Sequence, residues 1–181
     1  MMSAAVALVL GTGIEVQASH HKELLDGIPA RGDDAERKSK NGRLDHEAEG
    51  VKVVVTYGRP SVRGRKVWGG LVQYGKIWRT GADEATTITF TKDVRLDGKK
   101  VAAGTYALFT IPGKNEWTWI LNRQAKQWGA YKYDASADVA RVKAKPASGS
   151  MAEALLFEGR DGAVVLRWGK LSVPLAFEAV D

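Results

Sequence analysis

The chain has 181 residues, no cysteine and a formal net charge of +6. Without cysteine it can form no disulfide bond, no thiolate metal site and no lipid-modified cysteine. After residue 50 it is markedly basic, with 21 Lys and Arg against 12 Asp and Glu. This charge favours encounters with anionic partners, although scattered cations are also typical of an ordinary solvated surface.

The N-terminal segment has the features of an export signal. Residues 4–10 are small and apolar, and Val16 and Ala18 are small residues at the positions that a signal peptidase reads. We therefore expect residues 1–18 to be a signal-like segment, although residues 1–3 lack the usual basic side chain. The apolar run is far shorter than the ~20 residues of a membrane-spanning helix, so we expect no transmembrane segment in the mature chain. The expected location is periplasmic or extracellular.

The next segment, residues 19–49, is mostly charged or small and is interrupted by glycine and proline. Such a composition buries too little apolar surface to order itself, so we expect a flexible polar linker. The folded domain is then predicted to cover residues 50–181.

Within that domain the dominant hydrophobic period is two, as in residues 51–55, 87–91 and 171–177. Turn sequences at 97–98, 112–115 and 161–162 lie between these stretches and predict three hairpins. Pro174 places the last strand at an edge or a bulge. The pattern predicts an all-β fold, a single-domain antiparallel β-sandwich that is jelly-roll-like or a flattened barrel, with at most one or two short helices.

Residues 57–90 combine glycine, arginine and aromatic residues in a way that no ordinary core strand needs. Guanidinium groups offer planar donors for carboxylate or phosphate, and glycine permits tight turns. Residues 79–84 place a guanidinium and two carboxylates around a turn, which forms either a polar site floor with Glu84 bonded to Arg79 or a structural ion pair. The ligand-binding candidates from this region are Tyr57, Arg59, Arg65, Arg79, Thr80 and Glu84.

Aromatic residues form a second set of candidates. Trp128 and Tyr131 flank Gly129 in a predicted loop, where exposed rings can stack on a ligand. Trp117 and Trp119 alternate on one strand and are expected in the core. Catalytic candidates are Glu84, Asp83 and Tyr131, with Asp83 and Glu84 able to converge only if the chain bends near Gly81 or Ala82.

Several kinds of chemistry lack the required residues. The three histidines, at 20, 21 and 46, have no second ligand at a metal-binding spacing, so we predict no metal site and no cofactor. The domain also has no Ser-His-Asp set and no phosphate-binding loop, and nothing indicates specific nucleic-acid binding. The sequence identifies no protein partner.

Four ordered motifs, at residues 57–65, 68–87, 104–113 and 127–134, resemble a bacterial family catalogued as domain of unknown function 2911. The resemblance covers about residues 45–181. Asp83 stands where the family commonly has asparagine. The resemblance implies an exported protein of an environmental bacterium and brings no established reaction.

Together these observations predict an exported domain that binds an anionic small molecule or a saccharide of the cell envelope. In this hypothesis Arg59 and Arg79 hold ligand oxygens and Glu84 orients Arg79. One alternative is a hydrolase or lyase of envelope polymer that uses Glu84 and a tyrosine, and it requires a raised pKa for Glu84. A second alternative is a structural or protein-interaction module, which predicts a flat surface and an exposed strand edge.

Overall fold

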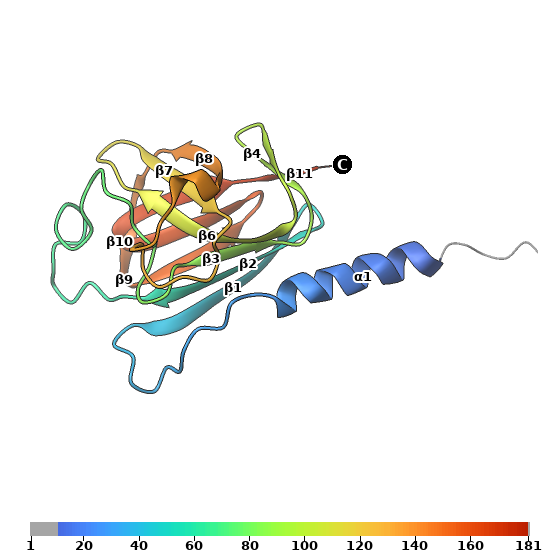
Figure 1. Ribbon diagram of the computed structural model, residues 1–181. Coiled ribbons are helices and arrows are strands. Elements are labelled where there is room, and N and C mark those ends of the chain that lie inside the picture. Colours follow the sequence, from blue (N-terminus) through green and yellow to red (C-terminus); the bar gives the residue numbers. More distant parts are fainter. Residues whose placement is uncertain (1–10, 181) are drawn as a thin grey trace, which may run out of the picture.

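The computed structural model describes residues 11–180, in which one α-helix precedes an antiparallel β-sandwich (Figure 1). The helix is α1 (Gly11–Asp26), and a three-residue 3-10 turn covers Ala135–Ala137. The strands are β1 (Lys40–Ala48), β2 (Val51–Arg59), β3 (Thr87–Phe90), β4 (Val94–Leu96), β5 (Lys99–Val101), β6 (Gly104–Ile111), β7 (Trp117–Asn122), β8 (Asp138–Ala144), β9 (Ala147–Arg160), β10 (Ala163–Ala176) and β11 (Glu178–Ala179).

Six strands form the main sheet, in the order β1-β2-β3-β6-β7-β8, with every pair antiparallel. The long hairpin of β9 and β10 covers one face of this sheet, and β11, β4 and β5 form a small third sheet (Figure 1). The predicted all-β antiparallel fold is confirmed. The predicted hairpins at 97–98, 112–115 and 161–162 are present as β4–β5, β6–β7 and β9–β10.

The main core lies between the six-stranded sheet and the hairpin, because alternate residues of each strand point to that side. Its largest fully buried side chains include Trp117, Trp119 and Trp168, as expected for the first two. The opposite face of the sheet carries a smaller apolar cluster around Phe109 and Ile120. Pro174 follows the last residue of β10 that pairs with β9, so its missing N–H costs no ladder hydrogen bond.

Much of the polar segment expected as a flexible linker, from Arg31 to Ala48, makes ordered contacts with the sandwich. Residues 40–48 form β1 and pair with β2 in unbroken register, so the domain begins before residue 50. Leu44 and Ala48 pack against the core, and the Nε2 atom of His46 lies 2.7 Å from the carbonyl oxygen of Arg160. Residues 40–48 form a strand in place of the expected linker because a strand at the sheet edge is stabilised by its partner and needs little apolar sequence of its own.

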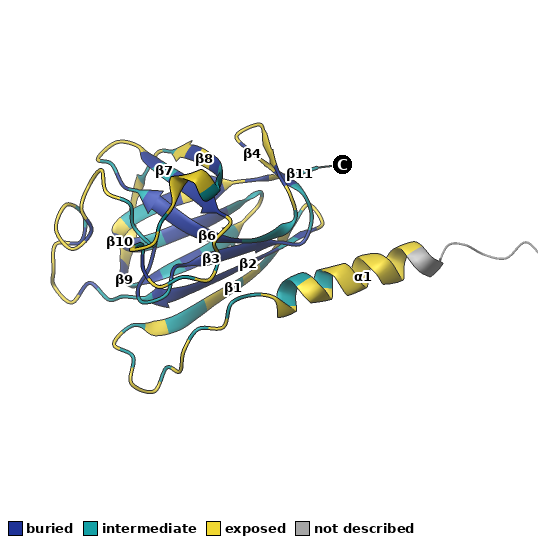
Figure 2. Ribbon diagram, viewed as in Figure 1, coloured by how far each residue is buried: buried dark blue, intermediate teal, exposed yellow. Residues whose placement is uncertain are grey.

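Helix α1 extends away from the sandwich, and most of its described side chains are exposed (Figure 2). The apolar residues of the expected export signal, residues 4–10, lie outside the described residues, and export remains a prediction. Among residues 11–180, no helix has the length and apolar character needed to cross a membrane.

Candidate functional site

A large cavity lies on the face of the main sheet opposite the β9–β10 hairpin. Two segments wall it: residues 27–39, here called the strap, and residues 123–134, here called the aromatic loop. Its volume is about 520 Å³, and we call it the aromatic pocket. The lining residues are Pro29, Ala30, Arg31, Thr56, Glu84, Ala85, Thr87, Ala125, Lys126, Gln127, Trp128, Tyr131 and Lys132.

Trp128 and Tyr131 stand on the rim of this pocket and remain 56% and 85% exposed. Their loop is nevertheless held in place, since the Gly129 N–H donates to the Asp83 carbonyl oxygen at 3.0 Å. Gly129 has a φ of 62°, a left-handed conformation that a side chain would strain. A well-anchored loop that leaves two large rings exposed is typical of a binding surface.

The aromatic loop is also fixed at its C-terminal end. The Asn122 side chain donates to the Asp134 carbonyl oxygen at 2.8 Å, and the Tyr133 hydroxyl donates to Asp138 at 2.6 Å. Burial, together with this carboxylate, raises the pKa of Tyr133 to about 12, so its hydroxyl stays protonated at neutral pH. Tyr133 therefore acts here as a structural donor.

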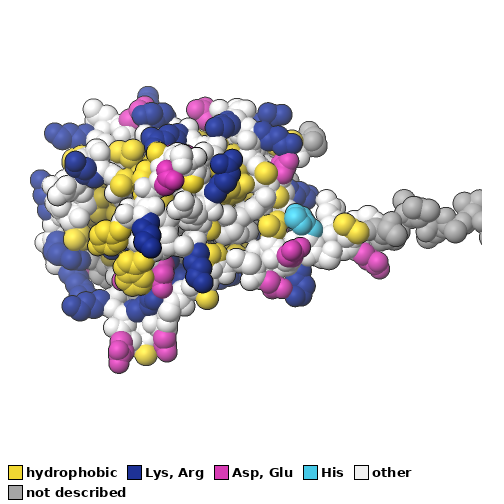
Figure 3. Space-filling model, in the orientation of Figure 1, with side chains coloured by type: hydrophobic (Ala, Val, Ile, Leu, Met, Phe, Trp, Pro, Cys, Tyr) yellow, Lys and Arg dark blue, Asp and Glu magenta, His cyan; other side chains and the backbone are white. Residues whose placement is uncertain are grey.

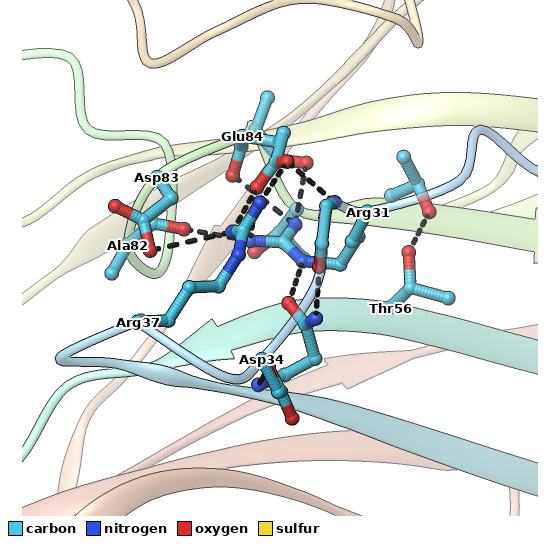
Figure 4. Close-up of polar contacts among 12 residues, drawn as sticks. Arg31, Asp34, Arg37, Thr56, Ala82, Asp83 and Glu84 are labelled. Carbon is cyan, nitrogen blue, oxygen red and sulfur yellow. Dashed lines mark hydrogen bonds and ion pairs between the residues drawn. The ribbon is translucent and has the colours of Figure 1, made fainter.

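The pocket floor comes from β2 and β3. Thr56 and Thr87 face each other across the two strands, and their hydroxyl oxygens lie 2.7 Å apart (Figure 4). The amide nitrogen of Gln127 donates to the Gln124 carbonyl oxygen, whereas its buried oxygen has no hydrogen-bond partner within residues 11–180. Buried acceptors normally find a donor, so this unpaired oxygen is an unsatisfied acceptor on a residue that lines the pocket.

Glu84 is clamped by two arginines of the strap (Figure 4). Arg37 donates to both carboxylate oxygens, at 2.6 and 2.5 Å, and Arg31 Nη2 lies 3.2 Å from the same carboxylate. The backbone N–H of Gly32 donates a further hydrogen bond at 3.0 Å. Arg31 also donates to the carbonyl oxygen of Ala82 at 2.7 Å, so the clamp ties the strap to the loop that precedes β3.

These contacts set the charge state of the clamp. Hydrogen bonds from Arg37 lower the pKa of Glu84 to about 2, against the opposing effect of partial burial. Burial lowers the pKa of Arg31, while the bonds to Glu84 raise the pKa of Arg37. Because arginine remains protonated well above neutral pH, the clamp is an ionised triad under ordinary conditions.

The predicted Arg79–Glu84 pair does not form. Glu84 faces the strap, whose arginines take both of its oxygens, and Arg79 makes no ion pair or side-chain hydrogen bond within residues 11–180. Asp83 and Glu84 do converge, because Thr80 and Asp83 adopt positive φ and bend the chain, and both carboxylates reach Arg37. A carboxylate with a pKa of about 2 stays ionised, which does not fit a general acid.

The remaining predicted residues separate into two groups. Arg65 and Arg79 line a second cavity together with Asp83, and that cavity is described further below. Tyr57, Arg59 and Thr80 line neither cavity and hold the fold together.

Each of these three structural residues has its own partner. The buried Tyr57 accepts a hydrogen bond from the Phe157 N–H at 3.2 Å, so in this structure its hydroxyl joins β2 to β9. Arg59 donates to the Leu155 carbonyl oxygen at 3.4 Å. The Thr80 hydroxyl is buried 3.1 Å from the hydroxyl of Thr110, out of reach of a ligand.

Sequence reasoning missed Arg31 and Arg37, which lie in the segment expected to be flexible. No local pattern marks them, because their partner Glu84 is 53 and 47 positions away. Thr56, Thr87 and Gln127 were also missed. The alternation of β2 and β3 could have placed the two threonines on the face away from the core. Within the described part of the chain, no group of three potential metal ligands occurs.

The fold and these cavities define a β-sandwich domain with a walled aromatic pocket on one sheet face. The family model described as a protein of unknown function (DUF2911) matches residues 39–177. Because the match covers more than half of the chain, the protein belongs to this family, as its sequence motifs indicated. No curated protein and no solved structure matches the chain.

Proposed function

We propose that this domain is exported and that it binds a saccharide of the cell envelope, neutral or anionic, in the aromatic pocket. One observation carries the proposal: Trp128 and Tyr131 are exposed on the rim of a cavity of about 520 Å³ and on a loop fixed by hydrogen bonds. The C–H faces of a sugar ring are apolar and pack against such aromatic faces.

The polar groups of the pocket suit the hydroxyl groups of a sugar. The free oxygen of Gln127 accepts a hydrogen bond, while the hydroxyls of Thr56 and Thr87 both donate and accept. Lys126 and Lys132 add positive charge beside the rings, which favours a saccharide that bears carboxylate or phosphate groups.

The hydrolase or lyase alternative receives less support, since Glu84 is an ionised structural carboxylate here. The protein-interaction alternative is also less favoured, because the exposed rings border a concave pocket and not a flat strand edge.

Saccharide titrations monitored by tryptophan fluorescence test the proposal. Soluble fragments of neutral and acidic envelope polysaccharides are added to wild type, Trp128→Ala and Tyr131→Ala, with Tyr74→Ala as a control for an exposed ring outside the pocket. Loss of one stacked ring should weaken binding about two- to twelvefold, since such contacts contribute ~0.5–1.5 kcal/mol. Tyr74→Ala should bind like wild type.

Wild-type affinity in both Trp128→Ala and Tyr131→Ala, or no saturable binding of any fragment to wild type, would contradict the proposal. The same mixtures are assayed for new reducing ends and unsaturated products. Product that forms with wild type and is lost in Glu84→Gln would instead favour the hydrolase or lyase.

A further inference from the structure

A second cavity lies at the end of the sandwich where residues 60–86 fold back, and it has a volume of about 370 Å³. Ala82 and Asp83 line it, whereas the next residue, Glu84, lines the aromatic pocket. The two cavities are therefore neighbours on opposite sides of one short loop. We call the second one the arginine cavity.

The charges around this cavity are strongly unbalanced. Its lining includes four cations, Lys38, Arg63, Arg65 and Arg79, against the single carboxylate of Asp83. That carboxylate also faces a fifth cation, since it lies 3.4 Å from Arg37. Lys and Arg side chains gather at this end of the molecule (Figure 3, left). Such a concave, positively charged site concentrates anions.

The cavity also contains donors without acceptors. Within residues 11–180, the buried Arg79 Nε and Trp168 Nε1 atoms have no hydrogen-bond partner. Trp168 is only 1% exposed, and both residues line the cavity. Leaving a buried N–H unpaired is unfavourable, so two such groups at one cavity point to an acceptor that binds there.

One guanidinium is already held in place. Arg65 donates to the carbonyl oxygens of Val62 at 3.0 Å and Ser61 at 2.6 Å, and its Nη1 group has no hydrogen-bond partner among residues 11–180. Its orientation is thus set before a ligand arrives, and little side-chain entropy is lost on binding. Trp78 stacks on Trp168 with ring centroids 6.0 Å apart, and this aromatic pair also lines the cavity.

We propose that the arginine cavity binds a phosphate or sulfate group, either free or as a monoester. Three guanidinium groups and an indole N–H offer donors in more directions than a planar carboxylate can use, whereas a tetrahedral oxyanion can accept from several at once. The proposal does not depend on saccharide binding, because the two cavities share no lining residue.

Isothermal titration of the full chain with inorganic phosphate, sulfate, glycerol 1-phosphate and acetate tests it, in a buffer free of these anions. The variants are Arg79→Gln and Arg65→Gln, and Arg95→Gln removes the same charge from an exposed site outside both cavities. We expect saturable binding of the tetrahedral anions and weaker binding of acetate. Each cavity variant should bind at least about tenfold more weakly, while Arg95→Gln stays within about twofold.

Comparison of free phosphate with glycerol 1-phosphate identifies the source of the group: tighter binding of the ester indicates a phosphorylated ligand. Circular dichroism checks the fold, and if Arg79→Gln is unfolded, the exposed Arg65→Gln still decides the question. Phosphate should change the fluorescence of Trp128→Phe as it does that of wild type, because Trp78 and Trp168 line this cavity. No saturable binding, or wild-type affinity in Arg65→Gln, overturns the proposal.

Discussion

At the scale of single residues, the most constrained group in the site is the carboxylate of Glu84. It accepts two hydrogen bonds from Arg37, one from Gly32, and lies in an ion pair with Arg31, whose side chain is 7% exposed. Removing one partner of such a pair leaves the other charge desolvated, and that residual penalty exceeds the net contribution of the intact pair. Glu84 is therefore more important for holding the strap than for chemistry.

We expect Glu84→Gln to lower the free energy of unfolding by about 2–3 kcal/mol, measured by urea denaturation. The value lies below the ~3–5 kcal/mol of a fully buried pair because the Glu84 side chain is 23% exposed. Glu116→Gln is the control, since its pair with Lys143 is exposed, and it should cost less than about 1 kcal/mol. Equal effects of the two substitutions would show that the clamp stabilises the fold no more than an exposed ion pair does.

The same group predicts a pH dependence. The pKa of Glu84 falls from 4.5 to about 2 on folding, so its ionised form is the one that folding favours. Its contribution is fully present above the unfolded pKa and is lost as the pH falls from about 4.5 toward 2. The stability difference between wild type and Glu84→Gln should be constant above pH ~5.5 and shrink below it. A difference independent of pH down to 2 would contradict the ionised clamp.

At the scale of elements, the strap and the aromatic loop are the segments that turn a sheet face into a pocket. The strap has no secondary structure and little apolar surface, and its order comes from polar contacts. Besides the clamp, Arg31 Nε donates to Asn41 Oδ1 at 2.9 Å, and the Asn41 side chain donates to the Gly32 carbonyl oxygen at 2.8 Å. The same few residues of the strap make all of these bonds. The strap should therefore open as one unit when the bonds are removed.

We expect the double variant Arg31→Gln/Arg37→Gln to release the strap while the sandwich stays folded. In hydrogen–deuterium exchange, amides of residues 30–38 should exchange faster than in wild type, and those of β2, β3 and β6 should remain protected. Lys38→Gln, on the same segment but without a partner in the described chain, serves as the control. Unchanged exchange in the strap of the double variant would mean that other contacts hold it.

At the scale of the whole molecule, stability resides in the core between the six-stranded sheet and the β9–β10 hairpin. Helix α1 adds little to it, because its side chains from residue 13 to 20 are exposed. A chain that starts at Gly27 should therefore unfold within about 1 kcal/mol of the full chain, measured by thermal and urea denaturation. A larger loss would show that α1 is an integral part of the fold.

The sequence by itself determined the antiparallel sandwich, its three hairpins, the buried Trp117 and Trp119 and the exposed Trp128 and Tyr131. These features depend on period-two alternation and turn residues, which are local and can be read within a few residues. Family motifs gave the domain limits only approximately, since β1 is stabilised by pairing with β2 and carries almost no apolar pattern of its own.

Only the tertiary structure decided which charges pair and which cavities form. Arg31 and Arg37 bind Glu84 although they lie 53 and 47 positions away in the sequence. Arg79 is nearer in the sequence but does not pair with Glu84. Arg79 is thereby left to the arginine cavity, and the predicted single site divides into two. Side-chain pairing of this kind depends on how the strap lies over the sheet, a long-range outcome of packing that no local residue pattern contains.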